Sequence, residues 1–177
     1  DYFKCGGKEL VVTRVAHQES VRCAELELPC QKGSLKLTAL TPGTWGNYIC
    51  AKLWYEYEKV GNVCTVDAEC SYVELDNTEN LTAGDIVELN VGEGKTICRE
   101  VEKIEENRIY FYKLNSIKKF EQTPEKLLIK KVFYSVILSG KNKKNETYLH
   151  LSMNKNDERY TVKYINDHSN LCKITES

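Results

Sequence analysis

Eight cysteines are the residues of this chain whose types and number point most directly to chemistry. They form no Cys-x-x-Cys pair, and the two close ligand pairs that announce a structural zinc site are missing. An even number of cysteines favours a disulfide framework, which is typical of proteins from an oxidising compartment. The sequence therefore predicts a secreted, extracellular protein that is held together by disulfides.

Catalytic and cofactor chemistry finds little support in the remaining residues. The histidines are scattered and belong to no nucleophile or zinc motif: His17, His150 and His168. Neighbouring carboxylates such as Glu56 and Glu58 are common in a chain with 29% charged residues, and the glycine pairs lack the strand and helix context of a phosphate loop. We expect no enzyme activity, no cofactor and no metal.

Strand signals dominate the chain, because β-branched and aromatic residues cluster in short and partly alternating segments. The expected strands are Leu10–Val15, Ser34–Leu40, Asn47–Tyr57, Ile86–Val91, Arg108–Tyr112, Lys130–Leu138, Thr147–Met153 and Tyr160–Ile165. A helix start is indicated only at Thr123–Leu128, where a hydroxyl residue precedes proline. The predicted class is all-β.

A short polar connector after Cys64 favours two modules, residues 1–66 and residues 67–177. Small domains bury little surface and gain from disulfide staples, which fits this division. No apolar run is long enough to cross a bilayer, so we expect no membrane partner.

Five residues of the first module carry a family resemblance, in the order Cys5, Cys30, Cys50, Trp54, Cys64. This order resembles a complement control protein module, also called a sushi domain. The stretch 43–58 and the motif Cys30–Gly33 are similar to divergent modules of immunomodulators secreted by parasitic nematodes. That group includes mimics of transforming growth factor β and inhibitors of the alarmin interleukin-33 or of its receptor. The second module resembles the family less, since it is enlarged and has no tryptophan.

The resemblance implies two disulfides, Cys5 to Cys50 and Cys30 to Cys64, with Trp54 packed against the second. Both modules then hold an odd number of cysteines, so at least one bridge must cross the boundary. We expect Cys23 to pair with Cys70 and Cys98 with Cys172.

The charge distribution suggests which surface binds a partner. Residues 74–106 hold ten acidic and three basic residues, whereas residues 113–144 hold nine lysines and two glutamates. Solvated edges that discourage sheet aggregation explain such lysines equally well. The functional interpretation is a basic face with aromatic anchors. Its expected binding residues are Lys118, Lys119, Lys130, Lys131, Tyr134, Lys141, Lys143, Lys144 and Tyr148.

The resemblance implies that the partner is a host cytokine, interleukin-33, or its receptor. Nucleic acid is disfavoured as a partner, because the net charge is −1 and no arginine cluster is present. Two glycosylation sequons, at Asn80 and Asn145, agree with a secretory route.

Two other fold classes share single features with this chain. Tyr48 lies two residues before Cys50, as in the tyrosine corner of immunoglobulin domains, but Trp54 follows that cysteine instead of preceding it. The Gly43-Thr44-Trp45 motif resembles the entry of lipocalins, although 42 residues precede it here. A carrier of a small hydrophobic ligand is therefore the alternative function.

Overall fold

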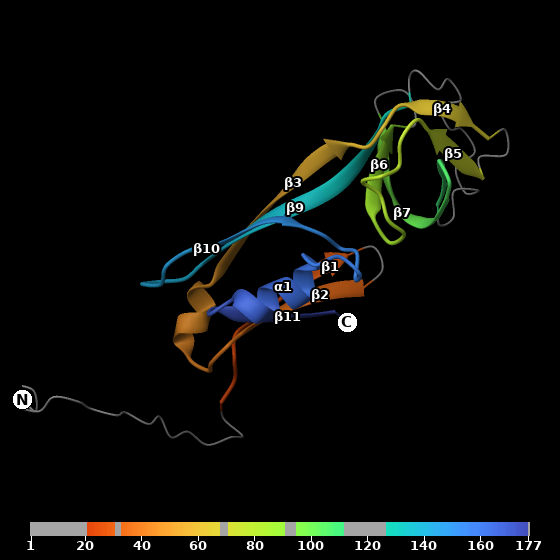
Figure 1. Cartoon of the computed structure of the whole chain (residues 1–177). Helices are drawn as coiled ribbons and strands as arrows, with labels where there is room; N and C mark the ends of the chain where they lie inside the picture. Colours follow the sequence, from red (N-terminus) through yellow and green to blue (C-terminus); the bar gives the residue numbers. More distant parts are fainter. Residues whose placement is uncertain (1–20, 31–32, 68–70, 91–94, 112–126, 177) are drawn as a thin grey trace, which may run out of the picture.

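β-strands dominate the regular structure of the described residues (Figure 1). The computed structural model describes residues 21–30, 33–67, 71–90, 95–111 and 127–176. Its strands are β1 (Glu25–Cys30), β2 (Gly33–Ala39), β3 (Cys50–Lys59), β4 (Val63–Val66), β5 (Tyr72–Leu75), β6 (Ile86–Asn90), β7 (Thr96–Glu105), β8 (Arg108–Phe111), β9 (Ile129–Ser139), β10 (Glu146–Leu151) and β11 (Cys172–Glu176). A 3₁₀ helix, η1 (Thr44–Tyr48), and one α-helix, α1 (Thr161–His168), complete it. The all-β expectation is confirmed at the level of class.

A long antiparallel ribbon of β3 and β9 runs along the molecule and connects its two halves. Its ladder runs from the pair Cys50 and Ser139 to the pair Lys59 and Lys130 without a register shift. On its other edge, β9 pairs with β6 through residues 129–131 and with β10 through residues 134–138. One strand thus joins two differently built halves.

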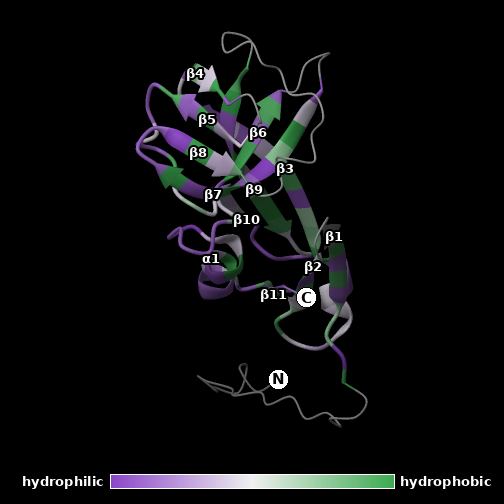
Figure 2. Cartoon of the chain, turned by 90° about the vertical axis from the view of Figure 1, so that its right-hand side faces the viewer, coloured by the Kyte–Doolittle hydropathy of each residue, from purple (hydrophilic) through white to green (hydrophobic). Residues whose placement is uncertain are grey.

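The first half is a curved sheet in the order β9-β6-β7-β8-β5-β4, shown at the upper right of Figure 1. Strands β5, β6 and β8 alternate buried and accessible positions, so one face of each strand is apolar. Figure 2 shows the same alternation as hydrophobic and hydrophilic segments along these strands. The apolar faces enclose a core of Val73, Leu75, Val87, Leu89, Val101, Ile109 and Ile129, among others.

The second half packs a three-stranded sheet, in the order β1-β2-β11, and α1 beneath the other end of the ribbon (Figure 1). Its core contains Leu37, Tyr134, Leu138, Tyr148, Leu151, Ile165, Leu171 and Ile174. Distant parts of the sequence meet in this second half, because β11 pairs with β2 along five residues from each strand.

One expected strand is wrong: residues 161–168 form helix α1. Thr161 and Ile165 are the buried residues of this helix, and their spacing of four places both on one helical face. The Thr161 hydroxyl donates to the carbonyl of Ser152 at 2.8 Å, which holds the first turn against the preceding loop. The alternation of apolar and polar residues in Tyr160–Ile165 therefore belongs to a short amphipathic helix. The expected strand Leu10–Val15 and most of the expected helical turn Thr123–Leu128 lie outside the described residues.

The boundary expected between residues 66 and 67 does not separate two sheets. Strand β3 from the first predicted module pairs with β9 from the second, and β2 pairs with β11. Strand β4 pairs with β5 directly across the boundary. Backbone pairing across the boundary interleaves the two predicted modules. The first two residues of the expected connector, Thr65 and Val66, belong to β4.

No disulfide joins any two of the described cysteine side chains, which are Cys23, Cys50, Cys64, Cys98 and Cys172. The expected bond between Cys98 and Cys172 is corrected by this finding, because Cys98 lies exposed on β7 while Cys172 is buried on β11. Each of the three other expected pairs includes a cysteine whose side chain lies outside the described part, namely Cys5, Cys30 or Cys70.

Burial makes Cys172 a poor nucleophile, which gives a direct test of the correction. Burial raises the pKa of its thiol to about 11, and burial also raises the pKa of Cys98. Because the thiolate is the reactive form, we expect Cys172 to resist alkylation until the protein unfolds. Peptide mapping by mass spectrometry after labelling with and without denaturant measures this protection. A peptide that joins Cys98 to Cys172 in the unreduced protein would contradict the structure.

Candidate functional site

Two of the three lysines in the turn between β9 and β10 lie beside aromatic side chains of η1. Lys141 Nζ lies 4.7 Å from the ring centroid of Tyr48, and Lys143 Nζ lies 5.8 Å from that of Trp45. These distances fall within the range of cation–π contact. Lys144 is exposed in the same turn, and 55% of the Tyr48 surface is accessible. We call Trp45, Tyr48, Lys141, Lys143 and Lys144 the lysine–aromatic patch.

Local structure explains why this patch is presented to solvent. The turn that carries the lysines is polar, and Asn142 adopts a left-handed conformation (φ 59°) that asparagine tolerates well. On the other side, the Trp45 indole N–H donates to the Thr41 hydroxyl at 3.1 Å, which orients the ring. Two chain segments that are almost one hundred residues apart thereby form one surface.

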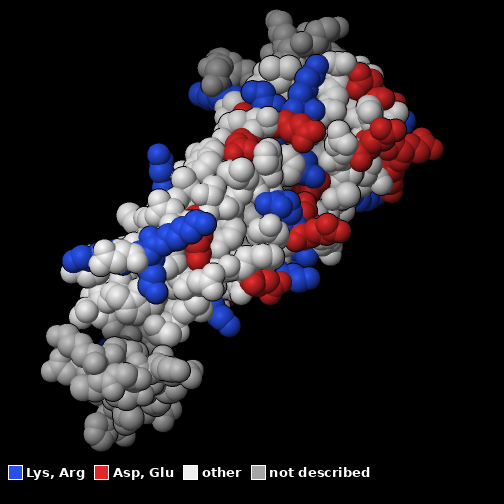
Figure 3. Space-filling view, turned by 60° about the vertical axis from the view of Figure 1, so that its left-hand side comes forward, with Lys and Arg blue, Asp and Glu red and all other residues white. Residues whose placement is uncertain are grey.

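The charge of the molecule is distributed along its length. In Figure 3, acidic side chains gather over the upper part, which holds the curved sheet, and a group of basic side chains lies lower down on the left. The acidic segment of residues 74–106 belongs to the curved half, whereas the turn of Lys141, Lys143 and Lys144 lies at the far end of β9. The turn lysines are therefore remote in space from the acidic segment, whereas Lys130 and Lys131 lie beside β6 in the curved half.

Lys131, by contrast, forms an ion pair with a buried aspartate. Its ammonium lies 2.8 Å from Asp85 Oδ2, and the side chains of Lys131 and Asp85 are 12% and 0% exposed. The Lys131 ammonium also donates to the backbone carbonyl of Asn80 at 3.3 Å. A lysine that compensates a buried carboxylate cannot be withdrawn for a partner at low cost. Its expected role in partner binding is therefore replaced by a structural one.

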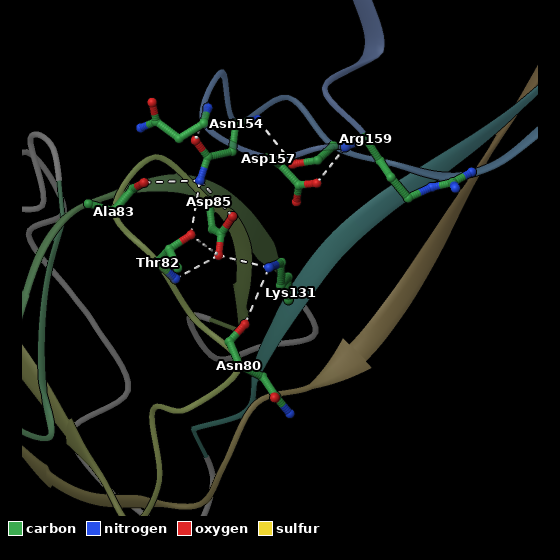
Figure 4. Close-up of polar contacts among 10 residues, drawn as sticks. Asn80, Thr82, Ala83, Asp85, Lys131, Asn154, Asp157 and Arg159 are labelled. Carbon is green, nitrogen blue, oxygen red and sulfur yellow. Dashed lines mark hydrogen bonds and ion pairs between the residues drawn. The ribbon is translucent and has the colours of Figure 1, made fainter. Parts of the chain in front are cut away.

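The Asp85–Lys131 pair is the centre of a polar network that joins three segments (Figure 4). Asp85 also accepts hydrogen bonds from the Thr82 backbone N–H at 2.8 Å and from Asn154 Nδ2 at 3.0 Å. Asn154 comes from the loop between β10 and α1, so the network connects the curved half to the second half. Gly84 permits this approach, because its φ is +94° and an added Cβ would lie 2.7 Å from Asn154 Oδ1.

The two tyrosines expected as binding anchors lie in the core. Tyr134 is 6% exposed, and its hydroxyl contacts the Thr161 hydroxyl and the Met153 sulfur. Tyr148 is 7% exposed and donates to Glu146 at 2.9 Å, while burial, followed by this bond, raises its pKa to about 12. Both side chains therefore stabilise the second half. The aromatic residues beside the lysines are Tyr48, which is exposed, and Trp45, which is half-buried against the core of the second half. Sequence reasoning named them only for their resemblance to the tyrosine corner and to the lipocalin motif.

Of the other expected binding residues, Lys130 is half-buried and lies 5.5 Å from the Tyr57 ring, away from the lysine–aromatic patch. Lys118 and Lys119 lie outside the described residues. The sequon asparagines Asn80 and Asn145 are both exposed on loops. Trp54 is half-buried on β3 opposite Ser135, and its indole N–H donates to Glu56 at 3.0 Å.

A serine, a histidine and a glutamate meet on the outer face of the ribbon, but their order does not suit nucleophilic catalysis. Ser135 Oγ donates to Glu56 Oε1 at 2.7 Å, and His150 Nε2 lies 3.2 Å from Glu56 Oε2. In a hydrolytic triad the histidine lies between serine and acid, whereas here the acid lies between the other two. The hydrogen bond from Ser135 is the main cause that lowers the pKa of Glu56. The cluster therefore ties β3, β9 and β10 together.

An apolar groove of about 490 Å³ lies beneath the ribbon. Its walls come from strands of both sheets and include Leu35 and Leu37 of β2, Leu53 and Tyr55 of β3, and Val136 of β9. Tyr55 at its rim is 62% exposed. The groove is a site that could take an apolar molecule or be covered by another surface.

Within the described ranges, no group of three or more histidine, cysteine, aspartate or glutamate residues is arranged to hold a metal ion. No helix in the same ranges is long and apolar enough to cross a membrane. No protein-family model, curated protein or solved structure matches this chain.

Proposed function

We propose that this chain is a secreted immunomodulatory protein that binds a host alarmin cytokine, interleukin-33, and blocks its engagement by the receptor. The observation that carries a binding role is the lysine–aromatic patch, in which exposed lysines lie against Trp45 and Tyr48. The identity of the partner rests on the resemblance of Cys30–Gly33 and residues 43–58 to nematode immunomodulators, most of all to the alarmin release inhibitor.

The mechanism is occlusion, and no covalent bond is broken. Lysines at the rim of an interface attract an acidic partner and mainly raise the association rate. Aromatic side chains at its centre become desolvated and mainly slow dissociation. In the proposal, Lys141, Lys143 and Lys144 have the first role and Trp45 and Tyr48 the second.

The same proposal includes extracellular location and stapling by disulfides. Cys5 would pair with Cys50, Cys30 with Cys64 and Cys23 with Cys70, as in divergent complement control protein modules. Each such bridge typically stabilises a domain by roughly 2–4 kcal/mol. Glycans at Asn80 and Asn145 would extend from exposed loops.

A direct binding measurement tests the partner. We expect immobilised chain to capture purified interleukin-33 in surface plasmon resonance and to prevent the cytokine from then binding its receptor ectodomain. Tyr48→Ala is expected to accelerate dissociation, and Tyr72→Ala, which changes a tyrosine in the curved half, serves as the matched control. Binding of the receptor ectodomain in place of the cytokine would redirect the proposal to the receptor. Binding of neither protein would refute it.

A carrier of a small hydrophobic ligand is the second candidate, and the apolar groove favours it. A volume of about 490 Å³ lies within the range of ligand pockets, which is roughly 300–1,000 Å³. Native mass spectrometry of protein purified without detergent distinguishes the two functions. A stoichiometric bound lipid or similar small molecule supports the carrier, whereas a ligand-free mass together with cytokine binding supports the first proposal.

A further inference from the structure

Strand β3 has one paired edge and one open edge. Among the described residues its only partner is β9, and the ten paired residues contain neither a bulge nor a proline. Natural proteins usually protect such an edge with bulges, prolines, charged side chains or a covering segment, because an open edge recruits another strand. Of these devices, the described residues of β3 show only charged side chains such as Lys52 and Glu58. The unpaired edge of β3 is therefore available for the addition of another strand.

The hydrogen-bond pattern shows which backbone groups face this open edge. The Val60 N–H donates to the Ile129 carbonyl at 3.3 Å, so residue 60 directs its backbone groups toward β9. Backbone groups alternate in direction along an antiparallel strand. The residues whose backbone N–H and C=O groups face β9 are therefore Cys50, Lys52, Trp54, Glu56 and Glu58. The residues whose backbone groups face the open edge are Ala51, Leu53, Tyr55, Tyr57 and Lys59.

The open edge is also apolar on the groove side. Leu53, Tyr55 and Tyr57, three alternate residues of this strand, are 42%, 62% and 50% exposed. Leu53 and Tyr55 are part of the wall of the apolar groove. A strand added at this edge would extend the sheet and cover these side chains.

We propose that the occupant is the β3 strand of a second copy of this chain, paired antiparallel about a two-fold axis at Tyr55. In this register Tyr55 faces its own copy, and Leu53 faces Tyr57 of the other chain. All of these residues direct their backbone groups outward, so the ladder can form without a shift. Self-complementary pairing of one surface patch is what a two-fold dimer requires.

Charge complementarity on the opposite face selects this partner. The same register places Lys52 opposite Glu58 of the other copy, and the symmetry repeats this pair. Both residues are exposed, and opposite charges directly across strands stabilise pairing. The groove sides of both copies meet at Tyr55. The lysine–aromatic patches lie at opposite ends of the paired ribbons, because the strands run antiparallel.

Charge reversal tests the register, with the whole chain studied by sedimentation equilibrium over a concentration series. The unchanged chain is expected to form a dimer. Lys52→Glu and Glu58→Lys each replace two attractive pairs by repulsive ones, which we expect to weaken dimerisation about tenfold or more. An equimolar mixture of the two variants restores both attractive pairs, so association is expected to return in the mixture alone.

A backbone variant tests the edge independently. The Tyr55 N–H faces outward, and proline is tolerated at such positions of an edge strand. Tyr55→Pro is therefore expected to remain folded, with an unchanged circular dichroism spectrum, and to stay monomeric. Tyr55→Phe keeps the ring and the N–H and is expected to dimerise.

A monomeric unchanged chain at all concentrations overturns the proposal, as does unaltered dimerisation of both charge variants or failure of their mixture to associate. A monomer that carries a bound apolar molecule in native mass spectrometry assigns the groove to a ligand and also overturns it. Cytokine binding is measured separately, so either proposal can fail without the other.

Discussion

Asp85→Ala is expected to lower the free energy of unfolding by about 3–5 kcal/mol, because it leaves the Lys131 ammonium largely buried without its counter-ion. The substitution also removes one acceptor of Thr82 and one of Asn154, which weakens the link between the two halves and leaves the hydrogen bond from Asn154 to the Ala83 carbonyl. For a domain of this length the loss corresponds to a fall in melting temperature of about 6–20 °C. Thermal denaturation followed by circular dichroism measures it.

Two variants separate this effect from the loss of any acidic side chain. Glu79→Ala removes an exposed carboxylate in the same loop and is expected to change stability by less than about 0.5 kcal/mol. Replacing both members of the pair, as Asp85→Leu with Lys131→Met, is expected to cost less than Asp85→Ala, because no unpaired charge remains. Equal stability of Asp85→Ala and the unchanged protein would show that the pair does not hold the halves together.

Lys141→Glu combined with Lys143→Glu is expected to slow association with the cytokine about tenfold or more at low salt, because electrostatic steering controls this rate. Dissociation should change less, since Trp45 and Tyr48 remain. The effect should fade as the Debye length falls from ~10 Å at 0.1 M to ~3 Å at 1 M salt. Surface plasmon resonance at both salt concentrations measures the two rates.

Lys163→Glu combined with Lys173→Glu is the matched control, because it changes the net charge equally at exposed positions on α1 and β11. We expect a smaller decrease in the association rate from this variant. An equal decrease would mean that net charge alone attracts the partner. Unchanged kinetics of Lys141→Glu with Lys143→Glu at low salt would mean that the turn is only a solvated edge.

Strands with a clear apolar pattern were predictable from the sequence. The expected segments Ser34–Leu40, Ile86–Val91 and Lys130–Leu138 agree with β2, β6 and β9 to within one or two residues. β7 was not predicted, because its sequence is rich in charged residues and only pairing with β6 and β8 defines it as a strand. α1 was misassigned because eight residues carry too little periodicity to separate alternation from a helical repeat.

The candidate site, too, was predictable from the sequence only in part. The lysines of the turn were predictable, because charged residues between two strong strands must lie at a hairpin tip. Their aromatic neighbours were not, since Trp45 and Tyr48 reach them only through the pairing of β3 with β9. Lys131 could not be distinguished from Lys130 by sequence, because the difference is a buried aspartate 46 residues away.

The sequence by itself determined the β-rich class, most strand positions and the uneven charge of the chain, because these depend on local composition and periodicity. Only the tertiary structure decided which residues are available to a partner. Long-range strand pairing buried Tyr134 and Tyr148, used Lys131 to compensate Asp85, and brought Trp45 and Tyr48 to the lysine turn. Burial and pairing depend on contacts between distant segments, and no local pattern encodes them.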